Sequence, residues 1–271
     1  MSMAELVPRF REEQVRIIES FLAHQLEVSG RKGVVLGLSG GLDSALVAKL
    51  CVDTLGARRV LALGLPEGRG GKDLEDARAW AKDLGIEFRV IDIAPMASAF
   101  DEHLKAKKAD RIARGNLRAR TRMVVLYWVA NTEDRLVIGT GNKSELLCGY
   151  FTRWGDGGAD FQPIGDLYKT QVREMSRHLG LPKRIVEKVP SAGLWPGQTD
   201  EGELGISYDE LDLILLGVEL QMEPEAIAEK AKVALGLVRR IEDLVAATAY
   251  KRKMPLIPKL GVRTLGLDWR E

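Results

Sequence analysis

Residues 33–44, GVVLGLSGGLDS, strongly limit what this chain can fold into. The segment starts as a predicted buried strand, because its first residues are almost all apolar: Val34, Val35, Leu36 and Leu38. The strand breaks at Ser39-Gly40-Gly41, and Asp43-Ser44 then opens a segment with the apolar spacing of a helix. A glycine-rich loop between a strand and a helix N-terminus is typical of an anion site, because free backbone N–H groups and the helix dipole point at the same place.

Asp43 is unexpected in such a site, since a carboxylate repels phosphate unless a divalent cation lies between them. The glycines let the backbone approach a phosphate closely, and Ser39 and Ser44 add hydroxyl donors. The string matches neither the Walker A pattern nor Gly-x-Gly-x-x-Gly. Two interpretations therefore stay open at this point: a phosphate loop with a metal, or a tight turn without a ligand.

Short strands alternate with helices on both sides of this loop. Strands are predicted near residues 34–38, 59–66, 87–93 and 136–139, and helices near 5–28, 45–55, 73–84 and 116–131. This alternation predicts an α/β fold with a parallel sheet that is covered on both faces. Ligands bind beyond the C-terminal strand ends of such sheets, so we expect the loop at 39–44, Leu65-Pro66 and residues 140–142 to converge.

The second half of the chain has a different pattern. Residues 149–160 and 190–205 show no periodicity, and long irregular stretches in compact domains are usually functional. Helices are predicted at 166–179 with Asp166 as the cap, at 207–220 after a Ser207–Glu210 capping box, and near 224–232 and 235–250. We expect the tail, 251–271, to pack across the surface. Because the sequence contains no linker, residues 1–271 are predicted to form one domain. Within it, the C-terminal helices and the tail, from about residue 206 to 271, are expected to pack on the rest.

Composition excludes several classes of function. The net charge of +1 gives no global field that would recruit nucleic acid or an anionic membrane. No apolar run approaches the ~20 residues of a membrane span, and the N-terminus lacks a signal-peptide pattern. Cys51 and Cys148 lie in apolar helical patterns without metal-ligand spacing, which predicts buried free thiols. We therefore expect a cytoplasmic protein with no nucleic-acid or membrane partner.

The SGGLDS loop resembles the SGGxDS pyrophosphate loop of the N-type ATP pyrophosphatases, which split ATP between the α and β phosphates. Further blocks follow in an order familiar from one family: NLRARTRM (116–123), GTGNKSE (139–145), GYFTRWGDGGAD (149–160), LYKTQV (167–172), PSAGL (190–194) and QTDEGELGISYD (198–209). Together they resemble the ammonia-dependent NAD synthetases, from about residue 33 to 251. The resemblance implies the parallel-sheet, Rossmann-like three-layer fold of the N-type ATP pyrophosphatases, with extra C-terminal helices.

The activity implied is amidation of the nicotinate carboxylate of deamido-NAD. That carboxylate attacks the α-phosphorus of ATP, pyrophosphate leaves, and ammonia then displaces AMP from the mixed anhydride. These steps need charge neutralisation and alignment more than a protein nucleophile. The absence of a Ser/His/Asp or Cys/His motif from the sequence is consistent with this chemistry.

The resemblance also implies roles for individual residues. It assigns ATP to Gly37, Leu38, Ser39, Gly40, Gly41, Leu42, Asp43, Ser44, Leu65, Thr140, Lys169 and Ser191. It assigns deamido-NAD to Asn116, Arg120, Arg153, Asp160, Tyr250 and Lys251. Asp43 and Glu145 would bind Mg²⁺, Lys169 would offset charge on the phosphates, and Asp156 would receive ammonium near the nicotinate and act as general base.

Each assignment has a simpler alternative in the residues themselves. Glu145 also fits a surface helix position, and the arginine-rich run at 111–122 fits a solvated helix face. Asp156 stands in Gly-Asp-Gly, which is a common turn sequence. The chain also departs from the family pattern, because Tyr250 stands where histidine is frequent and Arg153 where lysine is frequent. Gly64 replaces the usual Arg or Met before Leu-Pro, so adenine contacts there would involve the backbone.

The nitrogen source is expected to be free ammonia, because about thirty residues before the loop leave no room for a glutaminase domain. A separate glutaminase partner stays open. Family members are homodimers with the dinucleotide site at the subunit boundary, and the helix at 116–131 would supply either that interface or ordinary core. Alternative functions are another adenylating enzyme, such as GMP synthetase or a tRNA-thiolating enzyme, or a non-catalytic adenine-nucleotide sensor.

Overall fold

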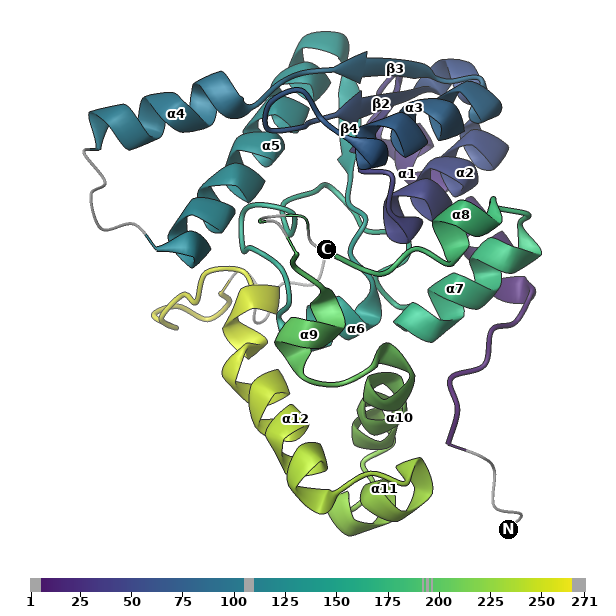
Figure 1. The fold of residues 1–271 in the computed structure, drawn as a ribbon, viewed down its shortest axis with the longest axis vertical. Helices are drawn as coiled ribbons and strands as arrows, with labels where there is room; N and C mark the ends of the chain where they lie inside the picture. The colour runs from purple at the N-terminus through teal and green to yellow at the C-terminus, as the bar shows by residue number, and fades with distance from the viewer. Residues whose placement is uncertain (1–5, 105–109, 192, 194, 196, 265–271) are drawn as a thin grey trace.

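The computed structural model describes residues 6–104, 110–191, 193, 195 and 197–264. Its centre is a parallel sheet with the strand order β3-β2-β1-β4 (Figure 1). The strands are β1 (Gly33–Gly37), β2 (Val60–Gly64), β3 (Glu87–Val90) and β4 (Arg135–Ile138). Because β1 is central, Val34 lies beside both Val60 and Leu136. The predicted parallel sheet is confirmed, although β3 ends three residues before the predicted boundary.

The first half of the chain also contains the helices that cover the sheet: α1 (Glu13–Ser29), α2 (Leu42–Leu55), η1 (Ala57–Arg59), α3 (Lys72–Leu84), α4 (Ala94–His103) and α5 (Arg111–Glu133). Val34 and Leu36 pack with α1, α2 and α3 on one face. Val35 packs with α5 on the other face, and α4 lies against α5. Alternate residues of one strand therefore enter two cores, as the period of a strand requires. This is the expected three-layer Rossmann-like arrangement.

The second half is helical: α6 (Lys143–Cys148), α7 (Lys169–His178), α8 (Lys183–Val186), α9 (Asp200–Leu204), α10 (Tyr208–Glu219), α11 (Pro224–Ala231), α12 (Leu235–Ala247) and η2 (Ala249–Arg252). The last three α-helices extend away from the sheet (Figure 1). They surround a separate apolar cluster that includes Tyr208, Leu211 and Ile241, and this cluster also takes in Cys148 of α6 and Tyr168. The cluster therefore joins the C-terminal helices to the segments that follow β4.

The predicted helix at 166–179 is wrong at its start. α7 begins at Lys169, where the Tyr168 backbone N–H donates to the Gln171 side chain at 2.9 Å. Asp166 does not cap the helix: its side chain is 95% exposed and pairs with Lys143 at 2.9 Å. Leu167 explains the shift, since its side chain is buried in the core and its carbonyl accepts from the Lys143 backbone N–H.

Other boundaries also move. α1 begins at Glu13 rather than near Glu5, which lies outside the described residues, and it ends as predicted before a left-handed Gly30. α5 begins five residues before the prediction, because the Asp110 side chain caps it by accepting from the Ala113 N–H at 2.7 Å. The predicted Ser207–Glu210 capping box is confirmed.

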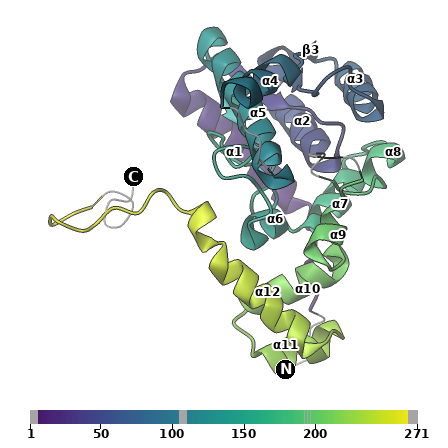
Figure 2. The ribbon, with the colours of Figure 1, turned by 60° about the vertical axis from the view of Figure 1, so that its left-hand side comes forward.

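The described tail begins in contact with the body, where Lys251 donates to the Gly149 and Phe151 carbonyls, but most of it does not pack across the surface. Residues 254–263 are exposed, with exposed fractions of 71% for Met254, 83% for Leu256 and 92% for Leu260. Figure 2 shows this segment running away from the body of the molecule. That part of the prediction is wrong, and residues 265–271 lie outside the described chain. Among the described helices, none is both long and apolar enough to cross a membrane.

Candidate active site

The loop after β1 is built to leave backbone N–H groups open. Its shape is held internally, because Ser44 Oγ donates to the Gly41 carbonyl at 3.1 Å and the Gly41 N–H donates to Ser39 Oγ at 3.2 Å. Gly40 has φ +79°, and a Cβ there would lie 2.2 Å from the Asp73 carbonyl oxygen, so only glycine fits. No side chain caps α2 at Gly41. The first turn of α2 is therefore free to receive an anion.

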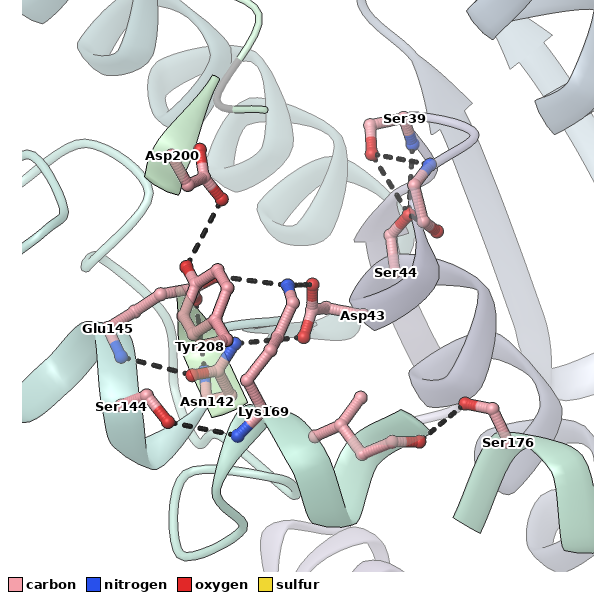
Figure 3. A network of polar contacts seen from close by, with 12 residues as sticks. Ser39, Asp43, Ser44, Asn142, Ser144, Glu145, Lys169, Ser176, Asp200 and Tyr208 are labelled. Atoms are coloured by element: carbon pink, nitrogen blue, oxygen red, sulfur yellow. Dashed lines mark hydrogen bonds and ion pairs between the residues drawn. The ribbon is translucent and has the colours of Figure 1, made fainter. Parts of the chain in front are cut away.

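The loop does not use all its predicted residues in the same way. The side chains of Leu38 and Leu42 are buried in the core, at 2% and 6% exposure. They can face a ligand only through their backbone groups. Ser39 Oγ and Ser44 Oγ lie 3.0 Å apart in the loop, although Ser44 is only 4% exposed (Figure 3).

A buried lysine lies between two carboxylates next to this loop (Figure 3). Lys169 Nζ pairs with Asp43 Oδ2 and lies 3.4 Å from Glu145 Oε1. The lysine side chain is only 3% exposed, and each carboxylate side chain is 17% exposed. Three residues that are far apart in the sequence thus form one charged cluster, and Glu145 is not the surface residue of the simpler alternative.

Three helix N-termini position this cluster. Asp43 lies in the first turn of α2, Glu145 in the first turn of α6, and Lys169 is the first residue of α7. Asn142 fixes Glu145 through a capping box, since Asn142 Oδ1 accepts from the Glu145 N–H at 3.0 Å and Glu145 Oε2 accepts from the Asn142 N–H at 3.2 Å. Asn142 Nδ2 also donates to Asp43 Oδ1 at 3.0 Å. The same side chain therefore fixes both acids.

The cluster contains more carboxyl groups than ammonium groups. Asp200 is also buried here: its Oδ2 accepts from the Tyr208 hydroxyl at 3.2 Å, its Oδ1 has no hydrogen-bond partner, and the Tyr208 ring lies 5.2 Å from Lys169 Nζ. Burial raises the pKa of Glu145, Lys169 lowers it, and Asp43 adds to the rise. Burial lowers the pKa of Lys169, but Asp43 and Glu145 more than offset this, so the lysine keeps its proton. One ammonium faces three carboxyl groups, an imbalance that favours a further cation.

The residues present fit a hard divalent cation. Asp43 and Glu145 supply two carboxylates, and among the residues the structure describes there is no group of three or more His, Cys, Asp or Glu side chains arranged to hold a metal. The remaining ligands would have to be phosphate oxygens and water. Mg²⁺ is commonly bound in this way, because it dehydrates reluctantly and pairs one or two carboxylates with substrate phosphates.

The other predicted ATP residues flank the loop. The Leu65 carbonyl, at the end of β2, accepts from Arg122 Nε at 3.0 Å. Thr140 lies half-buried in the loop that follows β4. Ser191 is exposed, and its hydroxyl donates to the Gln198 carbonyl at 2.7 Å. Leu65 and Thr140 thus follow β2 and β4, the two strands that flank β1, as predicted. Ser191 instead belongs to the segment that leads to Asp200.

A second group of predicted residues gathers around residues 149–160. The Thr152 hydroxyl donates to Asn116 Oδ1 at 2.7 Å, and Arg120 donates to the Arg153 carbonyl at 3.3 Å. The run at 111–122 is therefore only partly a solvated face. Asp160 lies at the other end, where it accepts from the Val137 N–H at 2.7 Å and from the Tyr127 hydroxyl at 3.2 Å.

The predicted C-terminal residues join the same group. Lys251 Nζ donates to the carbonyls of Gly149 and Phe151 at 2.7 and 3.0 Å. The Arg153 guanidinium lies 5.9 Å from the Tyr250 ring, which is a cation–π distance. The tyrosine that replaces the usual histidine thus contacts a positive side chain from residues 149–160.

Asp156 has the geometry of an aspartate in a turn, which is the simpler interpretation of Gly-Asp-Gly. The residue is exposed, and Oδ1 accepts from the Thr152 N–H at 2.8 Å, as a turn carboxylate does. This contact does not exclude a role towards ammonium, because one carboxylate has several acceptor sites.

Several residues at the site had not been predicted. They are Asn142, Ser144, Lys188, Asp200, Tyr208 and Asp212. The spacing of Asn142 and Glu145 is a capping-box pattern that could have revealed Asn142. Lys188 Nζ lies 3.0 Å from the Gly40 carbonyl and 2.6 Å from Asp73 Oδ1, contacts that no local pattern predicts.

Known proteins resemble this chain over nearly its whole length. The family model described as NAD synthase matches residues 14–255. The chain belongs to this family. It is 47% identical over 254 residues to an NH(3)-dependent NAD(+) synthetase of Methanosarcina acetivorans, covering 93% of this chain and 99% of that one. A second such enzyme, from Archaeoglobus fulgidus, is 49% identical over 251 residues, with 92% and 97% covered.

Solved structures of NAD synthase relatives have the same fold. The NMN synthetase of Francisella tularensis superposes with a TM-score of 0.82 at 37% identity, covering 93% of this chain and 100% of that one. The NH3-dependent NAD synthetase of Campylobacter jejuni, in complex with nitrate, gives 0.78 at 33% identity, with 92% and 98% covered. A glutamine-dependent NAD+ synthetase from Acinetobacter baumannii gives 0.67 at 29% identity, and the match covers 95% of this chain but 48% of that one.

Proposed function

We propose that this protein is an ammonia-dependent NAD synthetase, a carbon–nitrogen ligase that converts deamido-NAD, ATP and ammonia into NAD, AMP and pyrophosphate. The observation that carries the proposal is the cluster of Asp43, Glu145 and Lys169 beside an open, glycine-rich loop. A buried set of this kind suits a phosphate chain with a cation. The curated relatives that match nearly end to end are named for this reaction.

The loop and Lys169 act on the triphosphate in this proposal. Backbone N–H groups of the loop and the hydroxyls of Ser39 and Ser44 bind the β and γ phosphates, which leave as pyrophosphate. Lys169 neutralises charge that develops as the α–β bond breaks. Asp43 and Glu145 would hold Mg²⁺, which supplies further positive charge when bound. Leu65, Thr140 and Ser191 complete the ATP site.

The nicotinate side is assigned to the second group of residues: Asn116, Arg120, Arg153, Asp160, Tyr250 and Lys251. Its arginines and lysine suit the anionic dinucleotide, and the carboxylate of the nicotinate would be aligned for attack on the α-phosphorus. Asp156 would attract ammonium and accept its proton, so that ammonia attacks the acyl adenylate and AMP leaves.

The proposal also covers the nitrogen donor, the oligomeric state and the cellular location. Free ammonia is the nitrogen donor, in keeping with the matched curated relatives, which are named NH(3)-dependent NAD(+) synthetase. The protein forms a homodimer, with the dinucleotide site at the boundary. It works in the cytoplasm, in keeping with Cys51 and Cys148, which are buried and unpaired.

A second candidate is amidation of the mononucleotide. The similarity to an NMN synthetase at a TM-score of 0.82 favours it, although sequence identity is higher to the NAD synthetases, at 47–49% against 37%. Both reactions amidate a nicotinate carboxylate. The two substrates differ in that deamido-NAD carries an additional AMP half, which the site would have to bind.

One assay decides between these functions. Purified protein is supplied with ATP, Mg²⁺ and NH₄Cl, and with either deamido-NAD or nicotinate mononucleotide, and the products are separated by chromatography. We expect pyrophosphate, AMP and NAD, with a higher kcat/KM for deamido-NAD, and little turnover when glutamine replaces ammonium. Release of ADP, or binding of ATP without turnover of deamido-NAD, would contradict the proposal. The latter result fits a nucleotide sensor, and preference for the mononucleotide would support the second candidate.

A further inference from the structure

Asp212 is a fully buried carboxylate on α10, outside the set of residues assigned above. It accepts hydrogen bonds at both oxygens. Ser144 Oγ donates to Oδ1 at 2.5 Å, and the backbone N–H and hydroxyl of Thr170 both donate to Oδ2 at 2.8 Å. The two partners lie on α6 and α7, so a single side chain links three helices.

The partners of Asp212 are direct sequence neighbours of two residues of the charged cluster. Ser144 immediately precedes Glu145, and Thr170 immediately follows Lys169. Ser144 Oγ also accepts from the Lys169 backbone N–H at 2.9 Å (Figure 3). Asp212 and Ser144 therefore occupy the first two N–H groups of α7, and they do so from outside that helix. The bridge thus connects the first turns of α6 and α7.

A carboxylate at this position needs an explanation beyond packing. Its neighbours on α10, Leu211 and Leu215, belong to an apolar cluster, where a hydrophobic side chain would avoid the cost of a buried charge. Burial raises the pKa of Asp212, and the donors from Ser144 and Thr170 act against that rise. The N-terminal end of α7 further favours a negative charge here. The side chain is retained at a cost, in a place where it fixes two residues of the site.

We propose that Asp212 is a positioning residue for the ATP site. Through Ser144 and Thr170 it holds the first turns of α6 and α7 together, so that Lys169 stays between Asp43 and Glu145. This role rests on the proposed function, in which those three side chains bind Mg²⁺·ATP. Asp212 does not touch the substrates itself.

The test is Asp212→Asn, with Asp209→Asn as the matched control. Asp209 lies on the same helix and also contacts α7, through Arg173 at 2.9 Å, but its side chain is 73% exposed. The Kd of Mg²⁺·ATP is measured by calorimetry without deamido-NAD, and KM is then measured for each substrate. We expect Asp212→Asn to raise the Kd and KM of ATP about tenfold or more, as loss of supporting partners commonly does. The KM of deamido-NAD should stay within about twofold, and Asp209→Asn should change neither.

A merely structural role predicts a different result. Fewer folded molecules would lower the apparent kcat and the titration stoichiometry while leaving Kd and both KM values unchanged, and that outcome would overturn the proposal. If Asp212→Asn does not fold, Ser144→Ala removes the bridge to Lys169 and keeps the carboxylate. It should weaken ATP binding in the same selective way, and unchanged binding would again refute the role of the bridge. If the wild-type protein binds ATP but does not amidate deamido-NAD, the proposed function fails, and the ATP titration still decides the role of Asp212.

Discussion

Lys169 explains how two acids can be buried face to face in the folded chain. Two carboxylates a few ångströms apart repel each other strongly where water is excluded, and an ammonium between them removes most of that cost. Its own desolvation is offset by both partners, which is why its pKa rises. Carboxyl groups outnumber the ammonium next to the loop, and we propose that a metal and a triphosphate together complement the site better than either alone.

The metal assignment predicts a loss at low Mg²⁺ in two variants. Asp43→Asn and Glu145→Gln should each reduce the rate more than tenfold at limiting Mg²⁺, because each removes a carboxylate ligand, and excess Mg²⁺ should recover part of the loss. Steady-state rates across a Mg²⁺ titration measure this. Asp53→Asn is the control, since Asp53 lies on the same helix as Asp43 and pairs with Lys49 at 2.6 Å. Wild-type rates in both variants would refute the metal role.

The pKa of Glu145 adds a pH dependence to that experiment. Burial raises the pKa of this carboxyl group, so it holds its proton above the ordinary range for glutamate. A cation must displace that proton, and the apparent affinity for Mg²⁺ should therefore weaken as pH falls. Glu145→Gln has no proton to displace and should show a flatter dependence. An equal slope in both proteins would show that another group controls the titration.

The elements around the site meet at their N-termini. α2, α6 and α7 each present a first turn to the cluster, and the residues that fix these turns come from other parts of the chain: Asn142, Lys188 and Asp212. Helix dipoles that converge in this way favour anions between them. An isolated strand-loop-helix unit would have only one of the three N-termini, so the second half of the chain is part of the site.

Lys188 offers a test of how the loop is held. Its Nζ donates to the Gly40 carbonyl and pairs with Asp73 and Asp76, which orients the peptide that follows Gly40. Lys188→Met should weaken binding of pyrophosphate about tenfold, since a hydrogen bond from a charged group contributes about 1.5–3 kcal/mol. Calorimetric titration with Mg²⁺·pyrophosphate measures this. Lys183→Met, at an exposed position in α8, should bind as the wild type does. Equal affinities in both variants would contradict a supporting role for Lys188.

The sequence predicted the strands and most of the longer helices, because their periodicity extends over several residues. The predictions missed α6, α8 and α9, which have six, four and five residues and are too short to show a period. They also missed the ten-residue α4, in which only Ala97 is buried, so that it has no clear apolar face. Asp166 looked like a cap because aspartate is common there, but burial of Leu167 moved the start of α7. Asp212 had no local signal at all. Its partners lie 68 and 42 residues away, and only tertiary contacts bring them together.

At the scale of the whole molecule, the sheet is joined to a helical extension, α10 to α12, which contributes residues around Lys169. We propose that residues 1–271 form one domain, because α10 contributes Tyr208 and Asp212 to the surroundings of Lys169 while its other face packs with α11 and α12. Helices that share both a core and a hydrogen-bond network with the site are expected to unfold with it. Residues 254–263, beyond η2, are exposed and pack in none of these cores, so they are not expected to unfold together with the site.

The proposed homodimer needs a face that joins two copies, and α5 offers one. α5 presents Val124 and Trp128, which are 59% and 67% exposed, and α4 adds Phe100 at 49%. Exposed apolar side chains on two adjacent helices are typical of an interaction surface. Because α5 also carries Asn116 and Arg120, a second copy on this face would lie next to the proposed dinucleotide site.

Trp128→Glu should therefore convert the homodimer into monomers. A buried interface tryptophan commonly contributes about 2 kcal/mol or more, so the dimer Kd should rise roughly thirtyfold or more, and an added carboxylate in an apolar interface increases the loss. Sedimentation velocity across a concentration series measures this, and the KM of deamido-NAD should rise with the monomer fraction. Val28→Glu on α1 is the control, because Val28 is 69% exposed on a helix that covers the opposite face of the sheet. A Trp128→Glu protein that stays dimeric, or a wild type that is monomeric at assay concentrations, would exclude α5 as the interface.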